Sequence, residues 1–305
     1  MLTRSCLQEW FIPWSKNFIR SVIMVEQVEK INLDDYVATG EGATSIAYTH
    51  KTRDTIAKLY HPGFEADCAK KDFLTSCTAF DLGVPTPKPI RLITDGERFG
   101  AEYELVRNKR SFSRIISEEP GRLQELSLTF AEMAKKLHST KADTSKLVST
   151  KEKFRRFYLE KAVVPDFYKQ KALAFINTVP DTPTCLHGDL QISNVITDGK
   201  RTLWIDMGDF GYGDPGWDLG MLWSMTNRMD EQKADLVFHM NKEDLLAHWN
   251  IFFPAYMGTT DPQKLAEATK RVWPFAGVKI PYMFYIARNF RLPDEAFPYI
   301  AKLFG

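Results

Sequence analysis

The first third of the sequence alternates short apolar segments with turn residues, a pattern that predicts β-strands joined by tight loops. Turns are indicated by Arg53-Asp54 and by Asp95-Gly96, because polar residues and glycine favour tight loops. A loop that contains glycines separates the first two apolar segments. We therefore expect strands at 36–37, 46–49, 55–60, 90–93 and 99–106.

A first helix is predicted from about Glu65 to Leu82, where apolar residues recur at helical spacing. Gly83, followed by Val84-Pro85, supplies the signal that ends it. The expected apolar stripe of this helix consists of Ala69, Phe73, Cys77 and Phe80.

The remainder of the chain is predicted to be mainly helical. Apolar residues at helical spacing from Leu123 to Leu137 indicate a helix that ends near His138. Residues 221–250 have a similar pattern. Asp261-Pro262 begins another helix, since aspartate suits the position before a helix and proline its first turn.

The densest group of candidate catalytic residues lies between 186 and 220. Two short apolar segments flank an Asp198-Gly199 turn, which is a strong signal for a β-hairpin. We expect the hairpin to bring Asp206 close to Asp189 and Asn194. The carboxylate and amide oxygens of these side chains are hard ligands, which suit Mg²⁺ bound to a nucleotide phosphate better than they suit zinc.

A second candidate group lies in the glycine-containing loop and the strand that follows it. Gly40 and Gly42 would let the backbone approach phosphate oxygens, although such glycines are also common in ordinary hairpin turns. Lys58 stands in the middle of an apolar strand, either as a phosphate ligand or as part of a solvated face. Ile56 shares its face and is a candidate for packing against adenine.

The composition is that of an ordinary globular protein. The 305 residues are 44% hydrophobic and 26% charged, and the formal net charge of +1 gives no support for nucleic acid as the main partner. The four cysteines lack metal-ligand spacing, which favours a reducing cytoplasm, and no apolar run approaches a membrane span. We expect residues 1–30 to form an N-terminal arm, and Pro13 argues against a signal peptide there. Met24 offers a more conventional start for the protein. Our hypothesis is that the residues before it result from a wrongly assigned start site.

The spacing of His187, Asp189 and Asn194, followed by Asp206 after the hairpin, resembles the catalytic loop and metal-binding aspartate of protein kinases. Because Gly188 replaces the arginine of that loop, the chain resembles the aminoglycoside and choline kinase branch, the phosphotransferase enzyme family. The resemblance covers about residues 31–220. It implies an α+β, bilobal protein-kinase-like fold with a small antiparallel-sheet lobe and a larger, mainly helical lobe. The implied parts are an arm at 1–30, a nucleotide-binding lobe at 31–106 and a catalytic and acceptor-binding lobe at 107–305.

The resemblance also assigns residues to nucleotide binding. Lys58 would hold the α- and β-phosphates of ATP, and a helical glutamate of the family would pair with it. The matching residue here is Asp72, which is shorter than glutamate, with Glu65 as the fallback. Ser45 stands where the family loop has a third glycine.

Adenine would be bound by backbone groups of a hinge. By resemblance, Glu104, Leu105 and Val106 enter this hinge, where N–H and C=O groups would contact the edge of the base. Side chains contribute little to such a contact.

The reaction implied by the resemblance is transfer of the γ-phosphoryl group of ATP to a hydroxyl of a small molecule. Asp189 would accept the proton of that hydroxyl, and Asn194 and Asp206 would hold Mg²⁺. His187 would orient the loop, and Asp218 would tie the following helix back to it.

Three interpretations remain open at this point. The first is the small-molecule kinase, which is favoured because residues 207–217 leave no room for a long activation segment. The second is a nucleotide-binding module without turnover, similar to a pseudokinase. The third is a metal-dependent hydrolase that uses His187, Asp189, Asp206 and Asp209.

Two features bear on the acceptor. A basic stretch between Lys151 and Lys161 indicates either the solvated face of a helix or a contact for an anionic substrate. Acidic residues roughly balance basic ones in the last third of the chain, which argues mildly against a polycationic aminoglycoside.

Overall fold

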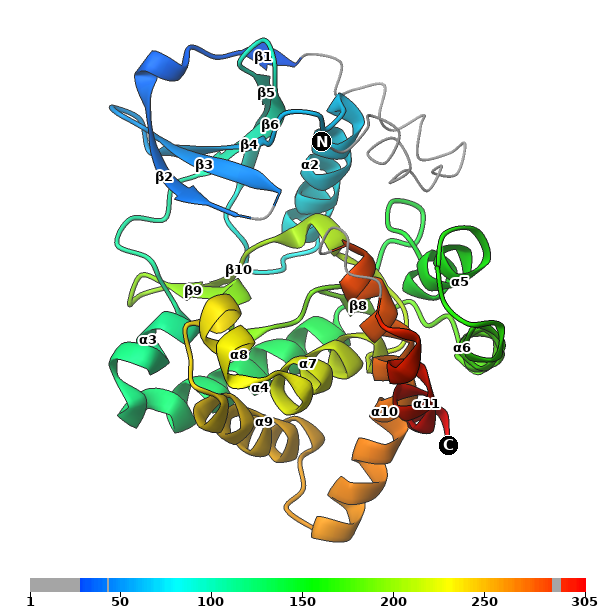
Figure 1. The fold of residues 1–305 in the computed structure, drawn as a ribbon. Helices are drawn as coiled ribbons and strands as arrows, with labels where there is room; N and C mark the ends of the chain where they lie inside the picture. Colours follow the sequence, from blue (N-terminus) through cyan, green and yellow to red (C-terminus); the bar gives the residue numbers. More distant parts are fainter. Residues whose placement is uncertain (1–27, 43, 287–291) are drawn as a thin grey trace. The chain divides into compact units, whose positions relative to one another are not determined.

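The computed structural model describes residues 28–42, 44–286 and 292–305, which form two compact units (Figure 1). The first unit takes the described residues up to Lys109, together with 145–147 and 198–210. The second unit takes the rest of the described chain. Asp206 therefore belongs to the first unit, although the sequence places it far beyond residue 106. The expected arm at 1–30 falls almost entirely outside the described residues.

The first unit is built on a six-stranded sheet with the order β1-β5-β6-β4-β3-β2. Its neighbouring strands are antiparallel, except for β1 and β5, which are parallel. The five strands expected from the apolar segments are confirmed. The strands of the first unit are β1 (Glu29–Lys30), β2 (Tyr36–Glu41), β3 (Ser45–His50), β4 (Thr55–Tyr60), β5 (Pro89–Thr94), β6 (Phe99–Glu104) and β10 (Thr202–Trp204).

Helix α2 (Ala66–Asp81) packs against β5 and β6, and its predicted bounds are confirmed. Gly83 ends it with a φ of 77°, a value that glycine adopts without steric cost. Phe73 is buried against the sheet, whereas Phe80, expected in the same stripe, is 39% exposed. The expectation for Phe80 was wrong because the helix end carries it away from the sheet. The buried cluster on this face consists of Tyr60, Ala69, Phe73, Leu92 and Ala101.

Strand β4 sends alternate side chains to opposite faces of the sheet. Ala57 and Leu59 are fully buried in a cluster with Ile31, on the face away from α2. Lys58 and Tyr60 therefore point to the face that α2 covers, where Tyr60 joins the buried cluster of that helix.

The second unit is mainly helical. Helix α4 packs beside α9, and α7 packs against α10 (Figure 1). Its described α-helices are α3 (Phe112–Glu118), α4 (Leu123–Ser139), α5 (Thr150–Glu160), α6 (Asp166–Thr178), α7 (Gly216–Arg228), α8 (Glu231–Phe238), α9 (Lys242–Met257), α10 (Pro262–Ile286) and α11 (Phe297–Ile300). The helices predicted after Leu123, after Gly220 and at Pro262 are confirmed.

Short strands in the second unit hold the segments around the candidate catalytic loop. β7 pairs with β9, and β8 pairs with β11, both antiparallel. They are β7 (Arg110–Ser111), β8 (Cys185–Leu186), β9 (Val195–Thr197) and β11 (Gly211–Tyr212). The short 3-10 helices of the two units are η3 (Leu33–Asp35), η4 (Pro120–Arg122), η5 (Ile192–Asn194), η6 (Met207–Asp209), η7 (Asp294–Ala296) and η8 (Ala301–Phe304).

The turn at Asp198-Gly199 is present, as predicted. The Asp198 carboxylate accepts the backbone N–H groups of Lys200 and Arg201 at 2.9 and 2.7 Å, and Gly199 has a φ of 86°. Strand β9 precedes this turn and β10 follows it. Among the described helices, none has both the length and the apolar character that crossing a bilayer requires.

Helices α7 and α10 approach each other more closely than ordinary side chains would permit. A Cβ at Gly216 would lie 2.3 Å from the ring of Phe275, and a Cβ at Gly220 would lie 2.7 Å from the backbone nitrogen of Ala276. Both positions therefore require glycine. Trp217, between them, is fully buried and stacks on Phe154 of α5 with ring centroids 5.0 Å apart.

Candidate functional site

Lys58 and Asp206 form an ion pair between segments 148 residues apart in the sequence. The ammonium group of Lys58 donates to a carboxylate oxygen of Asp206. The Lys58 side chain is 34% exposed and that of Asp206 is 52% exposed, so a solute could reach both. Burial opposes the charge on Lys58, but the attraction of Asp206 and Asp72 outweighs it and raises the lysine pKa above its ordinary value. The charged form of the lysine is therefore favoured.

Asp72 is the acid on α2 that the resemblance matches to the family glutamate. Its carboxylate accepts a hydrogen bond from the hydroxyl of Tyr60, which shares a face of β4 with Lys58. Burial raises the pKa of Asp72, although the charges of nearby lysines oppose this. The direct ion pair of Lys58 is with Asp206, so its pairing with Asp72 stays a prediction. Glu65, the fallback, precedes the first residue of α2.

The loop that starts at Asp206 is held against α2. Asp206 has a left-handed backbone (φ 61°, ψ 52°), which residues other than glycine rarely adopt. A Cβ at Gly208 would lie 2.7 Å from a carboxylate oxygen of Asp72, so a side chain at this position would have to displace either Asp72 or the loop. Lys71, also on α2, lies 3.7 Å from the Asp209 carboxylate. These contacts fix the loop that presents Asp206.

Of the glycines predicted to face phosphate, Gly40 lies near the end of β2, where it pairs with Ala47 of β3, and Gly42 lies in the loop between the two strands. Neither Gly40 nor Gly42 has a positive φ. A Cβ would lie 4.0 Å from Ala47 at the first position and 3.6 Å from the Ser45 carbonyl oxygen at the second, which are ordinary contacts. Contacts with other described residues therefore do not require glycine here. Glycine would be required at these positions if a bound phosphate occupied the space that a side chain would fill. Contact of Gly40, Gly42 and Ser45 with phosphate stays a prediction.

The backbone of the predicted hinge is partly used by the protein itself. The N–H of Leu105 donates to the Asp54 carbonyl oxygen at 3.0 Å, and the N–H of Glu104 donates to that of Lys88 at 2.9 Å. Of the three hinge residues, Val106 is therefore the one proposed to donate its N–H group to adenine.

Ile56 lies two residues before Lys58 on β4, so the two side chains share a face. It is half-buried and lies opposite Tyr103 of β6. Its packing against adenine stays a prediction.

In the second unit, Asp189 is held by two amide side chains of its own loop. Gln191 Nε2 and Asn194 Nδ2 donate to the same carboxylate oxygen of Asp189, at 2.7 and 3.0 Å. Asn194 Nδ2 also donates to the Asp189 carbonyl oxygen at 3.0 Å. Two hydrogen bonds therefore fix the orientation of this carboxylate and a third holds the backbone of Asp189, as a positioned general base requires.

Asp218 of α7 holds the backbone just before Asp189. Its carboxylate accepts the N–H groups of His187 at 2.7 Å and of Gly188 at 2.9 Å, and the ring of His138 lies at 3.2 Å. The other ring nitrogen of His138 bonds the Tyr256 hydroxyl at 2.8 Å. Asp218 is fully buried, which opposes its charge, but the hydrogen bond with His138 and the electrostatic interactions with His138, Lys279 and His187 outweigh burial and lower its pKa. It is thus a buried anion that organises the loop.

The hydrolase interpretation is disfavoured by the contacts of its proposed ligands. His187 is fully buried, and its Nδ1 accepts the N–H of Asp189 at 3.3 Å. Asp209 pairs with Lys71. Across residues 28–42, 44–286 and 292–305, no three His, Cys, Asp or Glu side chains are grouped as metal ligands.

The two predicted Mg²⁺ ligands have suitable chemistry. Asp206 offers an accessible carboxylate. The amide nitrogen of Asn194 donates to Asp189, and its amide oxygen is the atom that would bind the metal. Hard oxygen donors of this kind suit Mg²⁺. The two side chains belong to different compact units.

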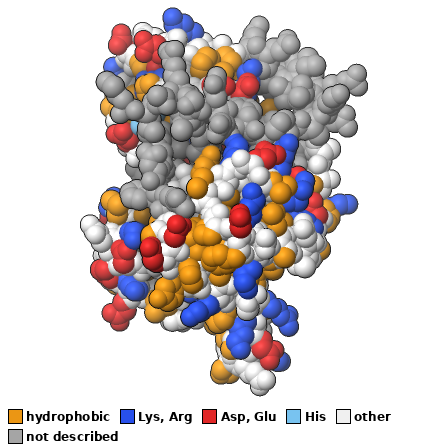
Figure 2. All heavy atoms as spheres, turned by 45° about the vertical axis from the view of Figure 1, so that its right-hand side comes forward, with side chains coloured by type: hydrophobic (Ala, Val, Ile, Leu, Met, Phe, Trp, Pro, Cys, Tyr) orange, Lys and Arg blue, Asp and Glu red, His pale blue; other side chains and the backbone are white. Residues whose placement is uncertain are grey.

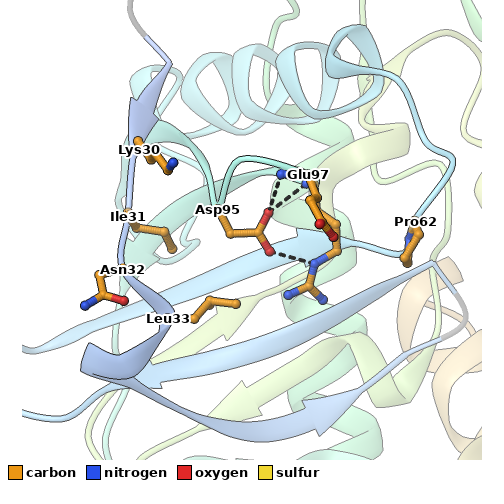
Figure 3. A pocket seen from close by; sticks show the side chains of 8 residues that line it. Lys30, Ile31, Asn32, Leu33, Pro62, Asp95 and Glu97 are labelled. Atoms are coloured by element: carbon orange, nitrogen blue, oxygen red, sulfur yellow. Dashed lines mark hydrogen bonds and ion pairs between the residues drawn. The ribbon is translucent and has the colours of Figure 1, made fainter.

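A cavity of about 820 Å³ lies in the first unit, beside the turn between β5 and β6 (Figure 3). In it, Asp95 accepts the N–H groups of Glu97 and Arg98 and the guanidinium of Arg98. Its lining contains no residue predicted for nucleotide, metal or catalysis, so we assign it no part in the reaction. The lining residues are Lys30, Ile31, Asn32, Leu33, Pro62, Asp95, Glu97 and Arg98.

The basic stretch on α5 is mostly engaged within the protein. Arg155 pairs with Glu152 at 2.8 Å, and Arg156 lies 3.8 Å from Glu160. Lys151 donates to two backbone carbonyl groups at the C-terminal end of α6. On the face drawn in Figure 2, basic and acidic side chains of the described residues are interspersed. The solvated-face interpretation is therefore favoured for these residues.

Sequence reasoning did not single out Tyr60, Gln191 or Lys279. Period-two alternation places Tyr60 on the face of Lys58, so it could have been found. Gln191 has only its proximity to Asp189 as a signal. Lys279 is a lone charge in an apolar segment, a feature that indicates burial with a partner but not which partner.

Comparison with known families gives a match over most of the chain. A model described as the phosphotransferase enzyme family matches residues 37–242, which is more than half of the sequence. A search of curated proteins found no match.

Several solved structures with similar folds are kinases or phosphotransferases of small molecules. One is a choline/ethanolamine kinase family protein from Mesorhizobium loti, 14% identical with a TM-score of 0.52, covering 94% of this chain and 91% of that chain. Another is a thermostable mutant of the aminoglycoside phosphotransferase APH(4)-Ia with AMP-PNP and hygromycin B, 12% identical with a TM-score of 0.60, covering 88% and 92%. A third is the amicoumacin kinase hAmiN with AMP-PNP, Ca²⁺ and Ami, 13% identical with a TM-score of 0.55, covering 95% and 92%. At this identity the likeness shows the fold, and the expected α+β kinase-like fold is confirmed.

Proposed function

The chain belongs to the phosphotransferase enzyme family, and from that membership we propose that it is a kinase that transfers the γ-phosphoryl group of ATP to a hydroxyl of a small molecule. The observation that carries the proposal is the ion pair of Lys58 with Asp206, because it joins a lysine whose charged form is favoured to a carboxylate at an accessible place. A nucleotide phosphate with its metal ion needs both charges.

In the proposed reaction, each residue has a limited task. The Lys58 ammonium attracts the α- and β-phosphates, and Gly40 and Gly42 leave space for phosphate beside their backbone. Asp206 and Asn194 are the proposed Mg²⁺ ligands. When bound, Mg²⁺ neutralises charge on the phosphates.

Proton transfer is assigned to Asp189. The acceptor oxygen forms a bond to the γ-phosphorus, the bond from that phosphorus to the β-phosphate oxygen breaks, and ADP leaves. The hydroxyl proton moves to the Asp189 carboxylate, whose orientation is set by Gln191 and Asn194. Such general-base help is typically worth about 10²–10⁴ in rate.

A small acceptor with a hydroxyl group is proposed from the relatives. They include a choline/ethanolamine kinase family protein, an ethanolamine kinase, an aminoglycoside phosphotransferase with AMP-PNP and hygromycin B, and an amicoumacin kinase with AMP-PNP and Ami. The short connection from Asp206 to α7 also favours a small acceptor over a protein substrate.

The proposal is tested by measuring ADP formation from Mg-ATP with panels of amino alcohols, sugars, amino sugars, nucleosides and aminoglycosides. We expect one panel to stimulate ADP release and to yield a product heavier by one phosphoryl group. Tight nucleotide binding with no turnover in any panel would instead support the binding module without catalysis.

A further inference from the structure

A buried lysine of α10 contacts the backbone of the candidate catalytic loop. Lys279 is only 2% exposed, and its ammonium group donates to the carbonyl oxygen of Gly188 at 2.8 Å. That carbonyl belongs to the peptide bond that joins Gly188 to Asp189. The lysine therefore acts on the residue directly before the proposed base.

Asp218 and Lys279 hold this residue from two helices. Asp218 of α7 accepts the Gly188 N–H at 2.9 Å, while Lys279 donates to the Gly188 carbonyl oxygen at 2.8 Å. Gly188 has a φ of 84°, a conformation in which a side chain would be strained. Its two peptide groups are thus fixed by an anion on one side and a cation on the other.

The close approach of the two helices lets both side chains reach the loop. Asp218 lies between Gly216 and Gly220, the two glycines that allow α10 to pack tightly on α7. Lys279 follows Phe275, which covers both glycines, by one helical turn.

The turn of α10 that carries Lys279 is itself fixed by hydrogen bonds. Pro281 has no N–H for the carbonyl group of Gly277, and the hydroxyl of Tyr168 donates to that carbonyl at 2.7 Å. The hydroxyl of Tyr158 donates to the next carbonyl, that of Val278, at 2.9 Å. Both tyrosines are fully buried, so the backbone before Lys279 is anchored on α5 and α6.

Stability alone is a poor explanation for a lysine at this place. Burying an ammonium group carries a desolvation penalty, and apolar side chains of similar size often serve stability equally well or better. The neighbours of Lys279 on α10 are apolar, and its ammonium group lies 5.7 Å from the ring of Phe154. A charge in such surroundings is expected where it serves an organised polar site.

We propose that Lys279 is a positioning residue for phosphoryl transfer, which fixes the Gly188 carbonyl and thereby holds the Asp189 carboxylate in the orientation that accepts the proton of the acceptor. The inference rests on the proposed function, because it assigns Asp189 as the base. Lys279 itself touches neither nucleotide nor acceptor in this account.

The test is Lys279→Met, which keeps the length of the side chain and removes its donor. We expect kcat to fall by about 10- to 100-fold, since small displacements of catalytic groups have effects of that size. KM for ATP should stay within about twofold, because the nucleotide ligands are untouched, and Tm should fall by less than about 4 °C. Lys270→Met, an exposed lysine on the same helix, is the matched control and should behave as the wild type.

A second measurement does not depend on turnover. Hydrogen exchange of the backbone amides from His187 to Leu190 should be faster in Lys279→Met than in the wild type, and unchanged in Lys270→Met. Lys279→Gln, which keeps an N–H donor, should lie closer to the wild type in both kcat and exchange, and it serves if the Met variant folds poorly.

The outcomes separate the two proposals. An inactive wild type would contradict the proposed function, while faster exchange would still support the contact made by Lys279. An active wild type with equal kcat in Lys279→Met, or equal exchange in all the variants, would overturn the positioning role and leave the kinase proposal intact.

Discussion

A Cβ at Gly208 would lie 2.7 Å from the nearest carboxylate oxygen of Asp72, so a side chain at this position would have to displace either this acid of α2 or the loop after Asp206. Asp72 also accepts the hydroxyl of Tyr60, and its charge attracts Lys58. One carboxylate thus contacts the loop that carries the proposed metal ligand and stabilises the lysine proposed to bind phosphate.

Replacing Gly208 should move that loop. We expect Gly208→Ala to weaken the binding of Mg-ADP by roughly tenfold, or about 1.4 kcal/mol, because the added methyl group must displace Asp72 or the loop. Isothermal titration calorimetry measures this affinity. The control is Gly121→Ala, where a methyl group would meet no described atom within 4 Å. Unchanged affinity in Gly208→Ala would show that the loop does not depend on this contact.

Removing the cation of Lys58 should affect the nucleotide much more than it affects folding. Ion pairs of partly exposed groups contribute only about 0–1 kcal/mol to stability, so Lys58→Met should change the unfolding free energy little. We expect KM for ATP to rise by about tenfold or more, since the ammonium group is proposed to bind phosphates. Steady-state kinetics and urea unfolding provide the two measurements. Lys51→Met, at an exposed lysine in the turn between β3 and β4, should leave KM unaltered. An equal effect in both variants would contradict a specific role for Lys58.

The glycine-containing loop allows a test in which stability and function separate. Gly40→Ala introduces a Cβ with only an ordinary contact, 4.0 Å from Ala47, so Tm should stay within about 4 °C of the wild type. If phosphate approaches this backbone, the methyl group should raise KM for ATP by several-fold. A variant with normal KM would remove Gly40 from the proposed phosphate loop.

The pH dependence of stability should report His248. Burial lowers its pKa to about 3, below the ordinary 6.5, and its Nδ1 lies 2.9 Å from the Ser127 hydroxyl. Between these values the unfolded chain binds a proton that the folded protein does not. This stability is therefore present above pH 6.5 and is lost as the pH falls, by about 1.4 kcal/mol per unit at most.

His248→Gln removes this titration and keeps an acceptor for Ser127. The slope of the unfolding free energy between pH 6 and 5 should become shallower than in the wild type. Chemical denaturation at several pH values measures the slope, and parallel curves for the two proteins would show that His248 is not buried as a neutral base.

Local patterns in the sequence were sufficient for the elements that present the site. Period-two alternation around Lys58 placed it opposite the buried Ala57 and Leu59, and Gly83 marked the end of α2. The spacing from His187 to Asn194 indicated a kinase-like catalytic loop, but the hydrogen bonds from Asn194 to Asp189 were not predicted from it.

Long-range contacts could not be found in this way. Nothing near Lys279 in the sequence indicates that its partner is the carbonyl of Gly188, because the contact depends on the close packing of α7 and α10. The exposure of Phe80 depends on how far the sheet extends beneath α2. The assignment of 198–210 to the first compact unit also depends on tertiary packing rather than on local propensity.

The most direct test of the account compares Asp189→Asn with the wild type in the presence of Mg-ATP and the acceptor that stimulates ADP release. Asparagine keeps the size of the side chain and removes its ability to take a proton. We expect kcat to fall by about 10²-fold or more, and the affinity for Mg-ADP to stay within about twofold of the wild type. Turnover at the wild-type rate in Asp189→Asn would contradict Asp189 as the base and, with it, the proposed mechanism.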